Sequence, residues 1–341
     1  MIRFILPSVF LTTAIALVVP AQAAGSLTRS FVSSAGSDSN PCTITQPCAT
    51  FAVAYAATVA NGIIAALDPG KYGPLTITGP VTINGNGWAA ITAPATGIGI
   101  SIQANAEDQV TLTGLEIDGA HAGYNGIVFN SGGNFTVTNC TLQNFVSSGS
   151  NTVTGNGIMI SPTSGTVNFS ISNTTASNNN ESAVFYNSPS NASTSVNGVI
   201  DHVVLTGNGL GIMFNSVGKV VLSVTNSTVS NNTVGINVGG SPGTGPIEAL
   251  ISDSHVDNNN QGINASGSST VFVRNVTVNQ SLAGVTAFGP AAVYFSQTTI
   301  TSIMFDQIPT GVELTGGAAY SDGTSHLSPI SGGSIGGWAV Q

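Results

Sequence analysis

The sequence has few charged side chains, and positive ones are the scarcest. Only 6% of its 341 residues are charged, with five Lys or Arg against 14 Asp or Glu. Charged residues make up about a quarter of a typical soluble domain. Because nucleic-acid binding depends on clustered cations that contact phosphates, this composition argues against a nucleic-acid partner. An anionic polysaccharide would also be repelled unless a divalent cation bridged it.

Residues that favour exposed helices are scarce as well, since Lys, Glu and Arg are the usual helix-surface residues. Val, Ile, Thr, Asn and 42 Gly residues are abundant instead. That mixture is typical of strands separated by tight turns. A chain of this length and uniform composition would normally split into several cores, unless it grows in one dimension by repetition. The composition therefore predicts a repetitive, mostly β architecture.

Long apolar runs are absent except at the N-terminus. Arg3 precedes an apolar run over residues 4–19, which ends at a proline and an Ala-Gln-Ala pattern. This arrangement predicts a signal peptide over residues 1–24, cleaved near Ala23 or Ala24, and hence a secreted, periplasmic or cell-surface protein. An uncleaved anchor is the alternative, but the run is short for a membrane span. No later segment predicts a transmembrane helix.

Cysteine is also rare, with three residues in the chain. Cys42 and Cys48 each follow a proline, and an oxidising compartment can close the short loop between them as a disulfide. A metal site is the alternative, but no His or third Cys lies nearby in the sequence. We therefore expect a Cys42–Cys48 disulfide. Cys140 occupies a repeat position that predicts a buried side chain.

What the chain does contain is a repeat. Eight units recur at intervals of 22 to 34 residues, and each has an anchor that is Gly or polar. Two positions before each anchor and three positions after it, the residue is apolar in all eight units. The anchors are Gly114, Asn139, Asn173, His202, Asn226, Asp253, Asn275 and Gln297.

Constant apolar columns combined with variable unit lengths exclude leucine-rich and helical repeats, whose periods are tighter. They indicate a parallel β-helix, in which strands stack at about 4.8 Å per coil and loops bulge from one corner. A Gly-aliphatic pair further along each unit, such as Gly157-Ile158, predicts another strand. The anchor column predicts a ladder of stacked amides inside the coils. Two positions after each anchor, side chains such as Thr175 and Thr228 are expected to face outward.

The start of the repeat carries a family resemblance. Residues 49–60, rich in Ala and Val, predict a short helix that covers the open end of the first coil. Residues 63–72, Ile-Ile-Ala-Ala-Leu-Asp-Pro-Gly-Lys-Tyr, follow it and resemble the opening segment of the pectate-lyase-like right-handed β-helix superfamily. The whole chain resembles the secreted right-handed parallel β-helix repeat proteins of bacteria. This resemblance implies extracellular carbohydrate chemistry or binding, although its motifs specify a fold better than an activity.

The expected fold is therefore all-β: a single-stranded right-handed parallel β-helix of about ten coils with a short N-terminal capping helix. We expect residues 25–72 to form the N-terminal loop and capping helix, and residues 73–315 to form the β-helix. Residues 316–341, rich in Gly, are expected to form a C-terminal cap or tail.

Glu116 and Asp118 are the candidate catalytic residues. They alternate with apolar residues on one expected strand, so both carboxylates should project from the same face about 6.6 Å apart. Glycoside hydrolysis uses two carboxylates separated by roughly 5 to 9.5 Å. The alternative is a solvated surface pair, because no cation or cleft is evident nearby in the sequence.

Asp253 and Asp257, with His255 between them and Arg274 one coil later, are the candidate metal ligands. They could hold Ca²⁺, but calcium takes six to eight oxygen ligands, and the flanking units offer only Asn, Ser and Thr. Solvated surface charge is therefore the favoured interpretation, and no cofactor is expected unless Ca²⁺ binds here.

Trp88 and Tyr124 are the candidate ligand-binding residues, because exposed aromatic rings can hold sugars. Together with the lack of cations, they favour a non-catalytic glycan-binding or structural surface protein. The alternative is a polysaccharide lyase or glycoside hydrolase. A lyase must stabilise anionic charge and move a proton, tasks for metal ions, Arg or Lys. The expected partner is a polysaccharide, and the sequence leaves the oligomeric state open.

Overall fold

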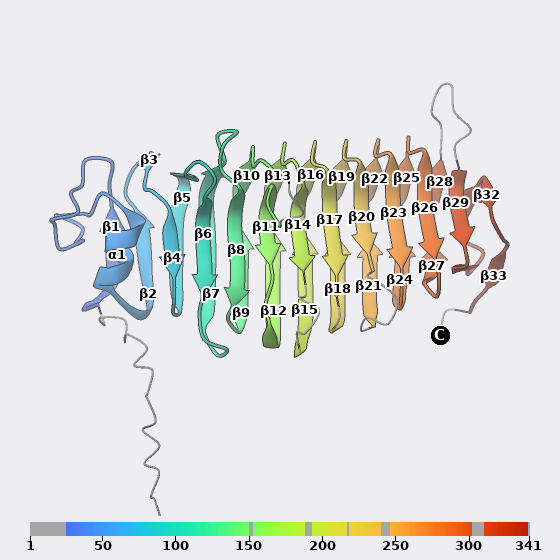
Figure 1. Cartoon of the computed structure of the whole chain (residues 1–341), viewed down its shortest axis with the longest axis horizontal. Coiled ribbons are helices and arrows are strands. Elements are labelled where there is room, and N and C mark those ends of the chain that lie inside the picture. Colours follow the sequence, from blue (N-terminus) through green and yellow to red (C-terminus); the bar gives the residue numbers. More distant parts are fainter. Residues whose placement is uncertain are drawn as a thin grey trace, which may run out of the picture.

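The chain forms a right-handed parallel β-helix of about nine turns, which confirms the expected fold class (Figure 1). The computed structural model describes residues 25–149, 153–187, 193–216, 218–239, 246–301 and 310–339. The predicted signal peptide, residues 1–24, lies outside these described residues.

Each regular coil contributes a long strand, a three-residue strand and a third strand on the opposite side. The long and short strands belong to one 22-stranded sheet, here called sheet A, and the third strands form an 11-stranded sheet, sheet B. All strand ladders of the described chain are parallel, because each strand within the stack pairs with its counterparts one coil earlier and one coil later; β12 (Ser164–Ser172), for instance, pairs with β9 (Asn134–Thr138) and β15 (Ser193–Asp201). The strands that pair on one side only lie near the two ends of the stack, such as β1 and β33 (Figure 1).

Sheet A therefore contains two kinds of strand. Its other long strands are β1 (Leu27–Val32), β2 (Thr58–Ala66), β5 (Val81–Thr92), β7 (Gln109–Asp118), β18 (Lys219–Thr225), β21 (Ile247–Ser252), β24 (Ser269–Arg274), β27 (Ala292–Ser296), β30 (Ala318–Ser321) and β33 (Ile335–Gly337). Its short strands are β3 (Gly70–Lys71), β10 (Thr141–Gln143), β13 (Thr175–Ser177), β16 (Val204–Thr206), β19 (Thr228–Ser230), β22 (His255–Asp257), β25 (Thr277–Asn279), β28 (Thr299–Thr301) and β31 (His326–Ser328).

Sheet B runs along the opposite side of the coil and is the sheet that matters for the candidate site. Its strands are β4 (Leu75–Ile77), β6 (Ile98–Gln103), β8 (Asn125–Ser131), β11 (Asn156–Ile160), β14 (Ser182–Asn187), β17 (Leu210–Asn215), β20 (Val234–Val238), β23 (Gln261–Ser266), β26 (Ala283–Phe288), β29 (Thr310–Thr315) and β32 (Ile330–Ser331).

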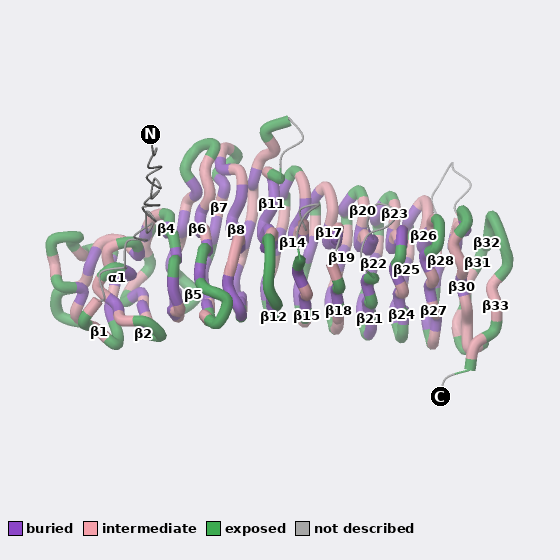
Figure 2. Tube along the Cα trace, turned by 60° about the horizontal axis from the view of Figure 1, so that its bottom comes forward, coloured by how far each residue is buried: buried purple, intermediate pink, exposed green. Residues whose placement is uncertain are grey.

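The interior of the coil is the apolar core that the repeat predicted. Both apolar columns are buried in all eight units, and burial alternates along the strands (Figure 2). The column before the anchors contains Leu112, Val137, Ile171, Ile200, Val224, Ile251, Val273 and Phe295, and the column after them contains Ile117, Leu142, Ala176, Leu205, Val229, Val256, Val278 and Ile300. Cys140 is a buried free thiol, and burial raises its pKa to about 11.

The anchor residues form the corner between the long and the short strand of each coil. Their seven non-glycine members adopt the left-handed conformation, with φ between 48° and 53°. Asn and Asp tolerate this region better than other side chains, which explains their frequency here. The corner turns these side chains into solvent, so the prediction of an internal amide ladder in this column was wrong.

The buried amide ladder lies at the next corner instead, after the short strand. Asn179, Asn208, Asn232 and Asn259 are at most 4% exposed. The Oδ1 atoms of Asn208, Asn232 and Asn259 each accept hydrogen bonds from the backbone N–H and the Nδ2 group of the Asn one coil earlier. Asn232 Oδ1, for example, lies 2.9 Å from Asn208 N and 3.1 Å from Asn208 Nδ2. Asn179 Oδ1 accepts from the backbone N–H of Phe145 instead. The Nδ2 groups of Asn208, Asn232 and Asn259 also donate to backbone carbonyls inside the coil, such as that of Leu205 for Asn232. These buried amides thus find their partners within the protein.

The N-terminal end of the stack is covered by the single helix of the described chain, α1 (Phe51–Ala57). It lies inside the range where a helix was expected, and it packs against β1, β2 and β4 (Figure 1). Thr50 caps it by accepting a hydrogen bond from Val53 N. The preceding loop contains the Cys42–Cys48 disulfide, with a Cα–Cα distance of 4.7 Å. Parallel pairing starts at β1, well before residue 73.

At the other end, residues expected to form a cap or tail continue the stack. Strands β30, β31 and β32 pair in parallel with β27, β28 and β29 of the coil before them, and β33 pairs in parallel with β30. Trp338 follows β33 and donates from Nε1 to the carbonyl of Phe295 at 3.2 Å. The last described residues therefore belong to the solenoid.

Asp68 ties the first coil to the N-terminal strand. Its carboxylate accepts hydrogen bonds from the Ser33 hydroxyl, the Ser34 backbone N–H and the hydroxyl of the buried Tyr72. These three donors, the Ser33 hydroxyl most of all, lower the pKa of Asp68 from 3.8 to about 2. The Asp-Pro-Gly-Lys-Tyr segment singled out in the sequence thus has a structural role.

We expect the stability of this end to depend on pH through Asp68. A carboxyl whose folded pKa is depressed stabilises the fold above its unfolded pKa, and this contribution is lost as the pH falls towards its folded pKa. The parent should therefore lose stability between about pH 4 and pH 2, where Asp68→Asn should show a shallower loss. Urea denaturation from pH 6 to pH 2 measures both, with the exposed Glu107→Gln as control. Parallel curves for the parent and Asp68→Asn would contradict this role.

A candidate cleft on the outer face of sheet B

One row of outward side chains on sheet B runs in register from coil to coil. The outward row changes character along the stack, from apolar over β8 to β17 to polar over β20 to β29. Its members are Val128, Met159, Phe185, Met213, Asn237, Asn264, Thr286 and Glu313. Apolar outward residues are unexpected on a solvated strand face, so the first half of the row indicates a covered or ligand-contacting surface.

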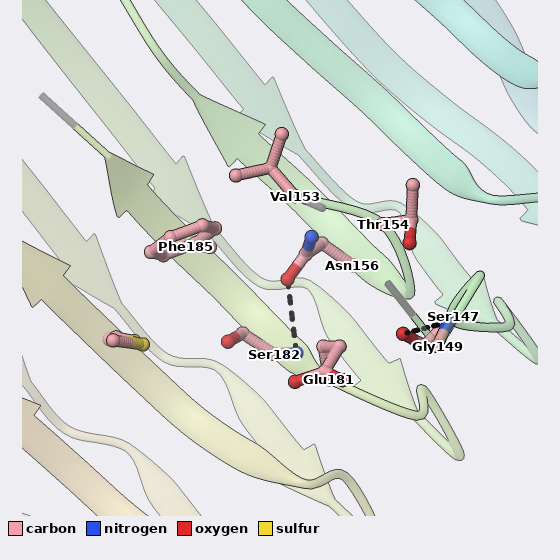
Figure 3. Close-up of a pocket in the computed structure, with 9 residues that line it drawn as sticks. Ser147, Gly149, Val153, Thr154, Asn156, Glu181, Ser182 and Phe185 are labelled. Carbon is pink, nitrogen blue, oxygen red and sulfur yellow. Dashed lines mark hydrogen bonds between the residues drawn. The ribbon is translucent and has the colours of Figure 1, made fainter. Parts of the chain in front are cut away.

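Described residues of one loop border the Phe185 and Met213 end of this apolar half. Residues 144–155 join β10 to β11, and the described parts of the loop, residues 144–149 and 153–155, border a cleft of about 360 Å³. The floor of the cleft comes from β11, β14 and β17, including Phe185 and Met213, and its wall includes Val153 and Thr154 (Figure 3). A more polar hollow of about 510 Å³ shares Ser147 and Glu181 with the cleft.

Beneath the cleft the backbone is held by a second set of buried amides. Asn125 Oδ1 accepts hydrogen bonds from the backbone N–H of Asn156 at 3.0 Å and from its Nδ2 at 3.2 Å. Asn156 Oδ1 in turn accepts from Ser182 N at 3.1 Å, as Figure 3 shows. This chain of bonds links β8, β11 and β14 beneath the cleft.

Glu181 is the ionisable group of the cleft. It lies immediately before β14, its backbone N–H donates to the carbonyl of Gly155 at 3.0 Å, and its own carbonyl accepts from Leu210 N at 2.8 Å. Gly155 is the neighbour of Glu181 one coil earlier and lies close to its side chain, because a Cβ on Gly155 would lie 2.9 Å from Glu181 Cγ. Within the described chain, no group donates a hydrogen bond to the half-buried Glu181 carboxylate. His121 borders the adjoining hollow, which Glu181 also lines.

The predicted catalytic pair lies elsewhere. Glu116 and Asp118 both face outward from β7 in sheet A, and neither lines the cleft or the adjoining hollow. Asp118 Oδ1 accepts hydrogen bonds from Ala120 N at 2.7 Å and Asn144 Nδ2 at 3.1 Å. Gln143 Nε2 lies 3.5 Å from Glu116 Oε1 and 3.4 Å from Asp118 Oδ2. The two carboxylates thus share one face with amide neighbours, and Asp118 holds a corner of the coil.

The predicted metal ligands flank one short strand of sheet A. Asp253 stands at an exposed corner and accepts a hydrogen bond from Asn275 Nδ2 at 2.7 Å, which lowers its pKa. Asp257 accepts from Asn279 N at 3.1 Å, and burial raises its pKa. His255 Nδ1 lies 3.9 Å from Asp257 Oδ2. In the parts of the chain that the structure describes, no group of three or more His, Cys, Asp or Glu residues could hold a metal ion.

The two predicted ligand-binding aromatics are not brought together. Trp88 is 46% exposed at an irregularity of β5 in sheet A. Tyr124 is half-buried just before β8, and its carbonyl accepts a hydrogen bond from Gly155 N at 2.6 Å. The backbone of Tyr124 therefore adjoins the loop over the cleft, whereas Trp88 belongs to the other sheet.

A row of aromatic rings on sheet A was not anticipated from the sequence. Phe272, Tyr294 and Tyr320 stack at centroid distances of 5.1 and 4.9 Å, and Trp338 contacts Phe272 and Tyr294 edge-on. Because the rings cover one another's faces, they do not offer a flat platform to a sugar ring. This row stabilises the C-terminal coils.

Sequence comparison places the chain in a family. A family model described as "Right handed beta helix region" matches residues 95–300. The chain belongs to this family. No curated protein matches the sequence. Among the described residues of this β-helix protein, no helix is long and apolar enough to span a membrane.

Solved structures with a similar fold include two enzymes. The pectate lyase Pel9A has a TM-score of 0.54 at 16% identity, over 92% of this chain and 80% of that chain. The A-module of the Azotobacter vinelandii mannuronan C-5 epimerase AlgE4 has a TM-score of 0.56 at 15% identity, over 82% of this chain and 91% of that chain. At these identities the likeness shows a common fold.

Glu181, Phe185 and Met213 were not identified from the sequence. The available signal was the position of Phe185 and Met213, each between two core residues of a strand and therefore on its outer face. Glu181 had no such signal, because its place in the cleft depends on residues of other coils that lie beside it in space.

Proposed function

We propose that this is an exported glycan-binding protein that holds a polysaccharide in the sheet B cleft without cleaving it. The observation that carries the proposal is the composition of the cleft: apolar side chains at its floor, hydroxyl and amide groups around them, and one carboxylate. Sugars have apolar C–H faces and hydroxyl rims, and binding sites that are mostly apolar with a few placed polar groups suit such ligands. Export rests on the predicted signal peptide.

Phe185 is the side chain expected to contribute most to sugar contact. It is half-buried and outward-facing, and its neighbours in the row are Met159 and Met213, so no aromatic ring of the described chain stacks on it. An aromatic face in this position can pack on the C–H face of a sugar ring. The cleft is open, and hydrogen-bonded amides support its floor. Both features favour binding of a polysaccharide along the surface of the stack.

Catalysis is disfavoured by the groups available. Hydrolysis of a glycosidic bond uses two carboxylates flanking it, and Glu181 is the only carboxylate among the described residues that line the cleft. Proton abstraction from a sugar carbon needs a base and stabilisation of the resulting anion by cations or metal ions. No Lys or Arg is among the cleft residues.

Glycan binding is testable by affinity electrophoresis or calorimetry of the purified mature protein with a panel of soluble polysaccharides. Phe185→Ala should weaken binding about tenfold, or by about 1.4 kcal/mol, as expected for an aromatic anchor. Phe272→Ala, which removes a ring from the sheet A row, is the matched control and should leave affinity unchanged. If the parent binds no polysaccharide, or if both variants lose equal affinity, the proposal is wrong.

A polysaccharide lyase or glycoside hydrolase is the second candidate, because both structural neighbours are named as enzymes of polysaccharides. Assays on pectate, alginate and neutral glycans, with and without Ca²⁺, decide between the two functions. We expect no turnover. Cleavage by the parent that disappears in Glu116→Gln, Asp118→Asn or Glu181→Gln would replace the binding function with an enzymatic one and identify the residue responsible, since losing a general acid or base typically lowers the rate by a factor of about 10² to 10⁴.

A further inference from the structure

We infer that the cleft selects uncharged polysaccharides, and that Glu181 is the residue that excludes uronate polymers. This inference rests on the proposed binding function and specifies its ligand class. It depends on the positions of the charged residues, on the lack of a described cation paired with the Glu181 carboxylate, and on the apolar side chains beside that carboxylate.

The Lys and Arg residues of the described chain all lie on sheet A. Arg29 is on β1, Lys71 on β3, Lys219 on β18 and Arg274 on β24. The described strands of sheet B contain no Lys or Arg. A polymer lying along the described strands of sheet B therefore meets no Lys or Arg that could neutralise a carboxylate on each sugar, and His121 lines the adjoining hollow but not the cleft.

Glu181 makes the same surface actively unfavourable for such a polymer. Its carboxylate borders both the cleft and the adjoining hollow, and no described cation pairs with it. It is half-buried beside Gly155 of the preceding coil, where repulsion between like charges is stronger than in bulk water. The same free carboxylate suits a neutral sugar, because it can accept hydrogen bonds from two hydroxyl groups, and hydrogen bonds to a charged acceptor are the stronger kind.

The apolar side chains of the cleft point to the same ligand. Phe185, Met213 and Val153 all line it. A uronate carboxylate placed among them would lose hydration without gaining a partner, which is unfavourable. A neutral sugar has only hydroxyl groups to satisfy and can direct its C–H face towards these side chains. The inferred ligand thus differs from the pectate and mannuronan in the names of the two structural neighbours.

Glu313 provides a matched control on the same sheet. It is outward-facing on β29, five strands beyond β14 in the sheet B order. Five strand spacings of about 4.8 Å place it roughly 24 Å away. This exceeds the Debye length of about 8 Å at physiological ionic strength, so Glu313 should not influence charge in the cleft.

The experiment compares the mature parent, Glu181→Gln and Glu313→Gln by affinity electrophoresis with EDTA present, so that divalent cations do not bridge carboxylates. The probes are a soluble β-glucan and a galactomannan as neutral polymers, and polygalacturonate and alginate as uronate polymers. The parent should be retained by a neutral polymer and by neither uronate polymer. Glu181→Gln should shift the ratio of uronate to neutral affinity by about tenfold, and the shift should shrink as salt is added. Glu313→Gln should match the parent.

The outcomes separate this inference from the proposed function. Retention of the parent by polygalacturonate or alginate as strongly as by the neutral polymers would overturn the uncharged specificity while leaving glycan binding intact. Equal shifts in Glu181→Gln and Glu313→Gln would overturn the role of Glu181. Lack of retention on all four polymers would overturn the proposed function and this inference with it.

Discussion

Val224→Asp is expected to prevent stable folding. Val224 is fully buried in the column before the anchors, between Ile200 and Ile251 of the adjacent coils. An unpaired carboxylate in this column would lose its hydration with no partner, a change that exceeds about 4 kcal/mol and so removes a large part of the total stability of a domain. Thermal and urea denaturation followed by circular dichroism measures the loss.

Two further variants make this result interpretable. Thr228→Asp adds the same carboxylate four residues later, on the outward side of β19, and should cost less than about 1 kcal/mol. Val224→Ala, which removes packing without adding charge, should cost about 2 kcal/mol and remain folded. Similar losses for Val224→Asp and Thr228→Asp would show that the inward and outward columns have been assigned incorrectly.

Asn232→Ala is expected to lower the free energy of unfolding by about 3 to 5 kcal/mol, because it breaks the buried amide ladder in the middle. The variant leaves the backbone N–H and the Nδ2 group of Asn208 without their shared acceptor. It also removes the donor to the Leu205 carbonyl and to Asn259 Oδ1. Each buried polar group left unsatisfied costs about 1 to 3 kcal/mol, so the loss should exceed that of an ordinary surface substitution several-fold.

Asn197→Ala is the matched control for the ladder. Asn197 also donates from Nδ2 to the Asn one coil earlier, Asn168, at 2.9 Å, but both side chains are exposed. Water can replace this bond, so the loss should stay below about 1 kcal/mol. Urea denaturation of both variants under the same conditions gives the comparison. Equal losses of the free energy of unfolding in the two variants would mean that burial of the Asn ladder does not increase its contribution to stability.

Several features of the site were open to sequence analysis and others were not. The outward-facing positions of Glu116 and Asp118 follow from strand alternation, and the structure places both on one face of β7. Their hydrogen bonds to Ala120, Gln143 and Asn144 depend on which corner the strand enters and which coil follows. The sequence also shows Asn, Ser and Thr throughout the repeats, but their orientation decides whether they form a ladder or a solvated corner.

The sequence by itself determined the class of fold and the identity of its core. Apolar residues in constant register with an anchor leave one periodic way to bury them, and variable unit lengths require that the extra residues form loops outside the coil. The tertiary structure decided which polar column is internal, because a left-handed residue at each corner reverses the direction in which the side chain points. It also decided where the cleft lies: described residues between β10 and β11, such as Ser147 and Val153, line it together with Phe185 of β14 and Met213 of β17, which come about 30 to 60 residues later in the chain. A carboxylate such as Glu181 becomes distinctive only through what surrounds it in space, and these contacts join coils whose residues are far apart in sequence.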